Sequence, residues 1–341
     1  MTSIALLVVN YRSSALALDA ICTARAATAR PLHVVAVDNS VDAAEAEALR
    51  AAADVVIASP ANAGYAAAIN AGRRACDAEL IVVSNPDVHF AAGAIDALAD
   101  AGAAVAGPAL FWDDAHQWLL PPAELHTRAE VIDRALASRW PARAERRDRR
   151  RFRARLAFWQ LRRTTRVRAI SGAVMAIRTK AFDEAEGFDE RYRLYFEEND
   201  FLRRVRGEIA YVPAARCRHL YNQSAAGSPE ASAAYAQSET AYLRRWGGMW
   251  AKGFERAQSL AVGRRPLAES SQQPTANGQQ PTFITEASPL PNFETAAGCL
   301  AGERDVSDDI WSAYRGDVLY MRTVAPDGRV LRAWTRHRIP A

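Results

Sequence analysis

The stretch Ile4–Asn10, IALLVVN, is a run of six apolar residues that ends in one asparagine. An uninterrupted apolar run of this length is typical of a strand buried on both faces of a sheet. The residues Ser13–Ala29 that follow are rich in alanine and leucine and begin with two serines that can cap a helix. The start of the chain therefore predicts a strand followed by a helix, the unit from which parallel sheets are built.

The same unit recurs through the first 110 residues. Because strands alternate with helices, we expect an α/β fold with a mostly parallel central sheet and helices on both faces. The further expected strands are His33–Asp38, Val55–Ala58, Leu80–Ser84 and Ala103–Gly107, and the further expected helices are Asp42–Ala53, Asn62–Asp77 and Ala91–Ala101.

Polar residues follow three of these strands, at the edge where such sheets bind ligands. They are Asn10-Tyr11, Asp38 with its two polar neighbours, and Asn85-Pro86-Asp87. A dinucleotide-binding domain would carry GxGxxG after its first strand, but VNYRSS stands there. A nicotinamide-dependent enzyme is therefore not expected.

Composition sets broad limits on the class of protein. The chain has 341 residues, of which 50% are hydrophobic and 24% charged, as in an ordinary globular protein. Its four cysteines are far apart and form no CxxC pair, so neither a disulfide framework nor a zinc site is indicated. No apolar run is long enough for a signal peptide or a membrane span. We expect a cytoplasmic protein that is soluble or attached to the inner face of the membrane.

A basic block interrupts the alternating pattern. The block spans Arg139–Arg168 and overlaps the end of an insertion at about 112–166. It holds thirteen arginines and two acids, so its local net charge is +11, whereas the whole chain has a net charge of +4. Such a block can bind nucleic acid, an anionic membrane or a lipid-linked pyrophosphate, or can simply be a solvated surface. Phe158 and Trp159 within it favour a membrane interface. We expect peripheral membrane contact and no nucleic acid, with the contact made by Arg149, Arg150, Arg151 and Arg153.

Regular structure resumes at Val167–Arg178. The segment that begins at Gly187 is expected to open a helix that runs to about Arg206. A strand at Ile209–Val212 and a helix at Ala231–Trp246 are expected to follow. Residues 251–293 are rich in Ser, Gln, Pro and Asn and predict a linker. Residues 294–341 form a small C-terminal extension, where Asp327-Gly328 between two apolar runs predicts a β-hairpin.

The segment Gly187–Asp200, GFDERYRLYFEEND, holds five carboxylates among large aromatic residues. A solvated helix surface can carry acids, but it does not usually alternate them with aromatic side chains. The mixture indicates the wall of a pocket, in which apolar packing excludes water and a few acids remain as bases or acceptors.

Taken together, the segments from Ser3 to Trp246 resemble the family-2 inverting glycosyltransferases of the GT-A fold, in particular their rhamnosyltransferase-like bacterial members. ANAGYAAAINAG, residues 61–72, is similar to the NxGxxxxxNxG loop of that family, and Asn85-Pro86-Asp87 is similar to its DxD element. Glu197-Glu198-Asn199-Asp200 resembles its Glu-Asp-x-Asp motif. The resemblance implies a GT-A domain over residues 1–250.

The resemblance also implies roles for single residues. It assigns the catalytic base to Glu198, with Glu197 as the alternative, and a Mg²⁺ or Mn²⁺ site to Asp87 and His219. The acceptor would meet Ser171, Gly172, Ala173, Tyr195 and Phe196. The nucleotide-sugar donor would meet Asn10, Tyr11, Asp38, Asn62, Gly64, Asn70, Gly72 and Asn85.

Each of these residues also has a structural interpretation. Asp38 can cap a helix, the glycines can serve close packing, and a single histidine such as His219 is often structural. The resemblance implies transfer of a sugar, with rhamnose suggested, from a nucleoside diphosphate to a hydroxyl of a glycan or lipid-linked glycan in cell-surface polysaccharide synthesis. The alternatives are a metal-dependent nucleotide-sugar hydrolase on the same sheet and a basic membrane- or nucleic-acid-binding protein.

Overall fold

The first strands form a parallel block at one end of the sheet. They are β1 (Ile4–Asn10), β2 (Leu32–Asp38), β3 (Val55–Ala58) and β4 (Leu80–Ser84). The computed structural model describes residues 2–220, 229–247, 253 and 283–338. In it, β1 lies between β2 and β4, β3 flanks β2, and all four strands are parallel. The apolar runs therefore predicted these strands correctly.

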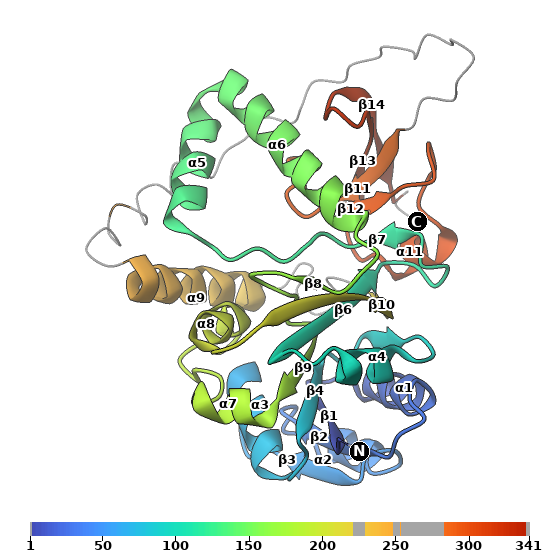
Figure 1. Ribbon diagram of the computed structural model, residues 1–341, viewed down its shortest axis with the longest axis vertical. Coiled ribbons are helices and arrows are strands. Elements are labelled where there is room, and N and C mark those ends of the chain that lie inside the picture. Colours follow the sequence, from blue (N-terminus) through green and yellow to red (C-terminus); the bar gives the residue numbers. More distant parts are fainter. Residues whose placement is uncertain (1, 221–228, 248–252, 254–282, 339–341) are drawn as a thin grey trace.

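Helices cover both faces of this block (Figure 1). Leu6 and Val8 of β1 pack with Ile21 on one face, and Leu7 packs with Ile69 on the other. Burial on both faces explains why β1 has no polar side to its sequence. The first face carries α1 (Ser14–Ala26), α2 (Ala43–Leu49) and α4 (Ala94–Asp100), and the second carries α3 (Tyr65–Arg74), α7 (Thr179–Glu184) and α8 (Glu197–Arg204).

Beyond β4 the sheet is mixed, so the expectation of a mostly parallel sheet is wrong. Strand β9 (Val174–Arg178) lies antiparallel between β4 and β6 (Val105–Phe111). Strand β10 (Ile209–His219) runs parallel to β6 but antiparallel to β5 (Val88–Phe90) and β8 (Thr165–Arg166). An apolar run indicates that a strand is buried but not the direction in which it runs. The α/β class itself is confirmed.

The insertion forms a helical arm above the sheet (Figure 1). Strand β7 (Trp118–Leu119) leads into α5 (Arg128–Arg139), which Thr127 caps by accepting a hydrogen bond from the Glu130 amide. Helix α6 (Pro141–Trp159) then begins with a proline at its first position, where no amide donor is needed. Helix α9 (Pro229–Gly247) packs on the arm, since Leu243 and Tyr242 share an apolar cluster with Val131.

The C-terminal segment continues the same sheet. It contributes β11 (Ile284–Ser288), β12 (Ala297–Cys299), β13 (Val318–Val324) and β14 (Val330–His337), together with the short helix α11 (Asp308–Ala313). Strand β12 pairs with β7, which joins these strands to the remainder of the sheet. The predicted hairpin is confirmed, because β13 and β14 are antiparallel neighbours on either side of Asp327-Gly328.

The predicted linker is wrong where its end can be compared with the structure. Strand β11 lies within residues 251–293, and all five of its residues are buried. Its sequence, ITEAS, looks polar, but Thr285 donates to the Gly302 carbonyl, and Glu286 pairs with two arginines. Residues 254–282 of the predicted linker lie outside the described residues.

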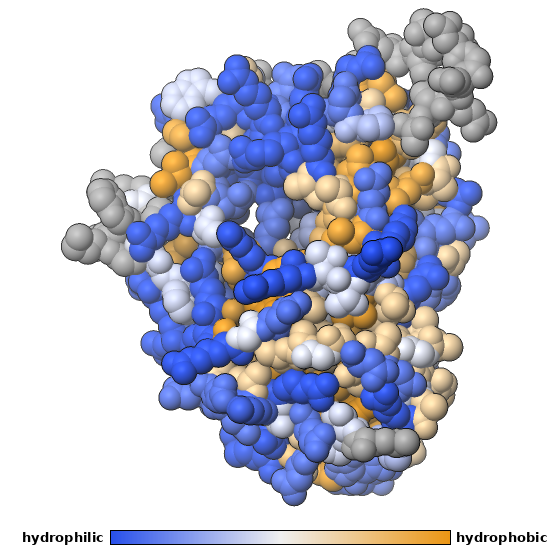
Figure 2. Space-filling view, viewed as in Figure 1, coloured by the Kyte–Doolittle hydropathy of each residue, from blue (hydrophilic) through white to orange (hydrophobic). Residues whose placement is uncertain are grey.

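Trp159 of the basic block is a core residue, so its expected place in a membrane interface is wrong, and Phe158 is half-buried against Tyr211. Phe152, Leu156 and Trp159 are buried against Ile284 and Val324 of the C-terminal strands. A Cβ at Gly298 would come within 2.3 Å of the Trp159 ring, so this glycine leaves room for the contact. The face over α5 and α6 is mostly hydrophilic (Figure 2). Among the described residues no helix is long and apolar enough to cross a membrane.

The acid-aromatic segment is mostly not helical, contrary to expectation. Residues Gly187–Phe196 form turns, and α8 begins only at Glu197. Gly187, Tyr195 and Phe196 have positive φ angles of 67°, 69° and 68°, which no right-handed helix accommodates. Two adjacent non-glycine residues in this region are rare, and such strained backbone is often found at functional sites.

Candidate active site

The ends of β1 and β2 carry a polar cluster. Asn10 donates to Asp38 Oδ1 at 2.8 Å and to Glu45 Oε2 at 2.9 Å, and both Asn10 and Asp38 are buried. The hydroxyl and amide of Ser40 also donate to Asp38 Oδ1. Asp38 therefore stabilises the turn that follows β2, and it also lies at the edge of the sheet where a ligand is expected. Glu45 has no motif that marks it in the sequence. Tyr11 is 51% exposed next to this cluster.

The glycine-rich loop shapes the neighbouring part of the edge. Asn62 Oδ1 accepts the Gly64 amide, and Gly64 has a φ angle of 95°. A Cβ at Gly64 would lie 2.5 Å from the Arg193 carbonyl oxygen, which accepts the Tyr65 amide at 2.9 Å. Gly64 is thus required for the loop to dock on the acid-aromatic segment.

Two residues expected at the donor have structural contacts instead. Asn70 uses both ends of its amide on the acid-aromatic segment, because its oxygen accepts the Phe188 amide and its nitrogen donates to the Phe188 carbonyl and Glu190. Gly72 faces Leu7 and Val37, and a Cβ there would lie 3.4 Å from both side chains. Gly72 is a packing glycine that seats α3 on the sheet.

Asp87 and His219 meet at the same end of the sheet. Asp87 follows β4, His219 ends β10, and the register of β5 and β10 places them together: His219 Nε2 lies 3.3 Å from Asp87 Oδ1. Burial raises the pKa of Asp87, but the attraction and hydrogen bond of His219, with a contribution from His89, outweigh it and leave the pKa lowered. The Asp87 carboxyl is therefore held ionised.

The loop at residues 171–173 adjoins the acids of α8. Ser171 Oγ accepts the Ala173 amide, and the Ala173 carbonyl accepts the Asn85 amide at 2.9 Å. A Cβ at Gly172 would lie 3.2 Å from Glu198 Cγ, so this glycine lets Glu198 approach the loop. The structure thus brings together Asn85, the 171–173 loop and Glu198, which lie far apart in sequence.

The two adjacent glutamates differ in their surroundings. Glu197 is 6% exposed, and its Oε2 atom is buried with no hydrogen-bond partner among the described residues. Burial, and then the charge of Glu198, raises the pKa of Glu197 well above its ordinary value. Glu198 is half-buried and accepts from Asn199 Nδ2 at 3.0 Å. Burial raises the pKa of Glu198 too, although its hydrogen bonds oppose the rise.

The aromatic residues of the segment are mainly core residues. Phe196 is 2% exposed and packs on Tyr235, Tyr242 and His126, so its expected place in an acceptor wall is wrong. Tyr195 is half-buried and has an edge contact with Tyr235. Its position beside α8 still allows contact with a ligand.

Asp200 braces α8. It is fully buried and accepts from Arg204 Nε at 2.7 Å and Trp246 Nε1 at 2.9 Å. Arg203 donates to Tyr242 and to the His126 carbonyl, which ties α8 to its surroundings. These contacts hold the N-terminal end of α8, with its two glutamates, against the sheet.

Tyr65 is a site residue that sequence reasoning missed. Burial raises the pKa of its phenol most, and the charges of Glu197, Glu198 and Asp87 raise that pKa further. Tyr65 therefore lies within electrostatic reach of both the acid pair and the Asp87–His219 pair. It occupies a variable position of the glycine-rich loop, and only its neighbours in the structure draw attention to it.

The four arginines expected at a membrane are already engaged. Arg151 is 14% exposed and pairs with Glu124 and Glu130, while Arg153 donates to the Asp327 carbonyl. Arg149 and Arg150 remain exposed and form surface pairs with Glu145 and Asp133. Among the residues that the structure describes, the exposed members of the basic block without a carboxylate partner are Arg139, Arg146, Arg162, Arg163, Arg166 and Arg168.

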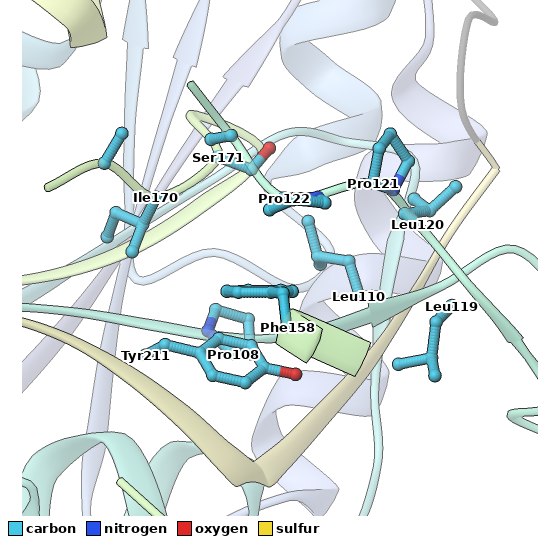
Figure 3. Close-up of a pocket in the computed structure, with 12 residues that line it drawn as sticks. Pro108, Leu110, Leu119, Leu120, Pro121, Pro122, Phe158, Ile170, Ser171 and Tyr211 are labelled. Atoms are coloured by element: carbon cyan, nitrogen blue, oxygen red, sulfur yellow. The ribbon is translucent and has the colours of Figure 1, made fainter. Parts of the chain in front are cut away.

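A narrow apolar pocket adjoins the 171–173 loop. Figure 3 shows Ser171 and Ile170 on one side of it and the rings of Phe158 and Tyr211 on another. These two rings lie 4.2 Å apart between centroids. The pocket volume of about 30 Å³ is enough for about two water molecules.

Comparison with known proteins places this geometry in a family. Residues 2–246 match the model of the glycosyltransferase like family 2. An N-acetylglucosaminyl-diphospho-decaprenol L-rhamnosyltransferase of Mycobacterium tuberculosis strain CDC 1551 is 30% identical over 254 residues, covering 66% of this chain and 78% of that protein. The protein of the same name from strain H37Rv matches equally well.

The fold comparison agrees with the GT-A fold. The crystal structure of GalNAc-T7 with UDP, GalNAc and Mn²⁺ superposes with a TM-score of 0.52 at 13% identity. It covers 75% of this chain, which spans only 50% of that larger chain. Given the family match over most of its length and this fold, the chain is a nucleotide-sugar glycosyltransferase and belongs to glycosyltransferase family 2.

Proposed function

We propose that this chain is an inverting glycosyltransferase that moves L-rhamnose from a nucleoside-diphosphate donor to a hydroxyl of a lipid-linked glycan during cell-surface polysaccharide synthesis. The observation that carries the reaction type is the placement of Glu198 against Gly172, in the loop whose Ala173 carbonyl accepts the Asn85 amide two residues before Asp87. The rhamnose and the lipid-linked acceptor are supported by the name of the 30% identical mycobacterial relative.

The electrostatics of the acid pair favour Glu198 as the base. Two adjacent buried carboxyls cannot both ionise easily, so they hold a proton between them. Glu197 is the more deeply buried, and its pKa is raised well above the ordinary value, so the proton resides there. Glu198 is then the ionised member, half-buried beside the 171–173 loop and able to reach an acceptor.

The reaction is a single displacement. The acceptor oxygen attacks C1 of the sugar while the bond from C1 to the diphosphate oxygen breaks, and the acceptor proton passes to Glu198. The nucleoside diphosphate leaves with the bonding electron pair, and the configuration at C1 inverts. No covalent intermediate is formed, so no side-chain nucleophile is required.

The residues present fit a divalent cation held jointly with the donor. No group of three or more metal-ligating acids, histidines or cysteines occurs among the described residues, so the protein alone offers the pair Asp87 and His219. Mg²⁺ and Mn²⁺ are commonly held by one or two protein groups, with substrate phosphates completing the shell. Such an ion would neutralise charge on the departing diphosphate. In this chain, Asp87 is kept ionised for that role.

The donor nucleoside would lie at the ends of β1 and β2. Asp38, oriented by Asn10 and Ser40, is placed to accept from a base or ribose, and the exposed ring of Tyr11 is available for stacking. Asn62 and Gly64 shape the loop beside it, and the Asn85 backbone fixes the 171–173 loop.

The acceptor side supports contact with a membrane surface rather than entry of a lipid into the protein. The pocket beside Ser171 holds about 30 Å³, which is too narrow for an isoprenoid chain. Arg162, Arg163, Arg166 and Arg168 are exposed in the strand and turns that lead to Ser171. They are better placed than Arg151 to meet an anionic headgroup or a lipid-linked pyrophosphate.

A donor screen tests the reaction. Release of nucleoside diphosphate is measured from several nucleotide sugars, with and without N-acetylglucosaminyl-diphospho-prenol, for the wild type and Glu198→Gln. Acceptor-dependent release from dTDP-L-rhamnose that Glu198→Gln abolishes supports the proposal. Hydrolysis at the same rate without acceptor supports the hydrolase alternative instead.

Vesicle flotation tests the membrane contact. We expect Arg163→Glu with Arg166→Glu and Arg168→Glu to abolish binding to anionic vesicles. The matched control reverses Arg139 and Arg146, which are also exposed but lie on the arm. Equal loss in both variants would indicate general charge attraction, and retained binding in both would exclude arginine-mediated docking.

A further inference from the structure

The hydroxyl of Tyr65 is buried without a hydrogen-bond partner among the described residues. A buried polar group that makes no hydrogen bond costs free energy, and native proteins contain few of them. Tyr65 begins the helix that docks on the acid-aromatic segment, where its amide donates to the Arg193 carbonyl, and a substrate atom bound there can supply the missing partner.

The fold holds Tyr65 in place without help from its hydroxyl. Its backbone amide donates to the Arg193 carbonyl, and the adjacent Gly64 adopts the positive φ angle that this docking requires. Its ring packs against the apolar cluster that contains Ile69 and Val83. The phenol oxygen is therefore dispensable for folding, although its position is fixed.

The surroundings of the phenol are acidic. The charges of Glu197, Glu198 and Asp87 all act on Tyr65. With burial, they raise the pKa of the phenol well above its ordinary value, which keeps the hydroxyl protonated as a donor. The hydroxyl thus has a proton to donate, and no acceptor of the described part of the chain lies within hydrogen-bond distance of it.

We propose that the Tyr65 hydroxyl binds the donor substrate, by donating a hydrogen bond to an oxygen of the sugar-diphosphate that lies between Asp87 and Glu198. This inference rests on the proposed transferase function, because it needs a sugar-diphosphate in that place. Tyr65 takes no part in proton transfer. Its hydrogen bond fixes the donor so that C1 faces the acceptor activated by Glu198.

The isosteric variant Tyr65→Phe tests this role. We expect kcat/KM for dTDP-L-rhamnose to fall about 10- to 100-fold, the range for loss of one hydrogen bond to a charged group. Calorimetric affinity for dTDP-L-rhamnose should fall in the same way, whereas affinity for dTMP, which lacks the sugar and second phosphate, should not change. The melting temperature should stay the same or rise, since an unpaired hydroxyl is removed.

Tyr320→Phe is the matched control. Tyr320 lies in β13 of the C-terminal strands, away from the proposed site, and should keep wild-type kinetics. Unchanged kinetics and donor affinity in Tyr65→Phe would overturn the inference while leaving the transferase proposal intact. A clear fall in melting temperature would also overturn it, because the hydroxyl would then have a partner within the protein. If wild type neither binds nor turns over any nucleotide sugar, the proposed function itself fails.

Discussion

Arg155 of α6 and Glu286 of β11 form an ion pair that is closed to solvent. Arg155 Nη2 lies 2.6 Å from Glu286 Oε1, and the two side chains are 2% and 0% exposed. Arg322 of β13 binds the other oxygen of Glu286 at 2.6 Å and also pairs with Asp148. This network joins the helical arm to the C-terminal strands, two regions separated by more than a hundred residues of sequence.

We predict that Glu286→Gln lowers the free energy of unfolding by about 3–5 kcal/mol, because it leaves Arg155 and Arg322 buried without their shared counter-charge. Urea denaturation measures the loss. Glu303→Gln is the control, since the Arg332–Glu303 pair is 59% and 42% exposed and should contribute no more than about 1 kcal/mol. Equal effects of the two substitutions would mean that the buried network does not hold the C-terminal strands.

This network also explains where sequence reasoning failed. The arginine block suggested a surface for anions, and β11 suggested a linker, because each segment looks too polar to be buried. Glu286 neutralises Arg155, so each can be buried only with the other. Periodicity describes one segment at a time and cannot reveal such a match. By contrast, β1 and β4 were predicted to the residue, because their burial is encoded in their own apolar runs.

The burial of Glu197 predicts a pH-dependent stability. In the folded state the pKa of Glu197 lies well above the ordinary 4.5, because the side chain is buried and because the charge of Glu198 lies close to it. The folded state therefore binds more protons than the unfolded chain does. The stability that this carboxyl contributes is complete at low pH and is lost as the pH rises from 4.5 through the folded pKa. Glu197→Gln removes the cost of ionising this buried carboxyl, so the stability of the variant relative to wild type should increase as the pH rises above 4.5. Parallel pH profiles in denaturation would contradict this.

The two glutamates should differ in catalysis. A base accepts a proton only when ionised, and burial raises the pKa of Glu198, so the acid limb of kcat/KM should lie above 4.5. Glu198→Gln should lower kcat by about 100- to 10,000-fold. Glu197→Gln should retain most of the activity, because the neutral glutamine side chain resembles the protonated form of Glu197. A larger loss in Glu197→Gln than in Glu198→Gln would reverse the assignment.

The contact between Gly172 and Glu198 gives a steric prediction. A methyl group at residue 172 would lie 3.2 to 3.5 Å from the Cγ, Cβ and Cδ atoms of Glu198, so Gly172→Ala should push the base away from the acceptor. We expect kcat to fall about 10- to 100-fold, as for other small displacements of reacting groups. The KM of the donor should change little, because Asp38 and Asp87 are untouched. A rise in donor KM with an unchanged kcat would show that the loop serves the donor instead.

The site was only partly predictable, for a related reason. Asp87 and His219 were paired through the family resemblance, and the structure places them 3.3 Å apart. Asn70 and Gly72 share one motif with Gly64, yet they serve packing. The sequence alone does not show which face of α3 packs against β1, so packing residues such as Gly72 cannot be told apart from residues that face the site. Tyr65 was missed because an aromatic residue at that position looks like ordinary core. What distinguishes it is a buried hydroxyl for which the described residues supply no hydrogen-bond partner.

The pair Asp87 and His219 predicts dependence on a divalent cation. Chelation with EDTA should abolish transfer, and Mn²⁺ should restore it. Because the protein offers so few ligands, loss of one should matter: Asp87→Asn and His219→Gln should each raise the Mn²⁺ concentration for half-maximal activity about 10- to 100-fold. His337→Gln is the control, since His337 is exposed at the end of β14 in the C-terminal strands. Full activity in EDTA, or an unchanged Mn²⁺ requirement in both variants, would show that the charge of the diphosphate is stabilised by other groups.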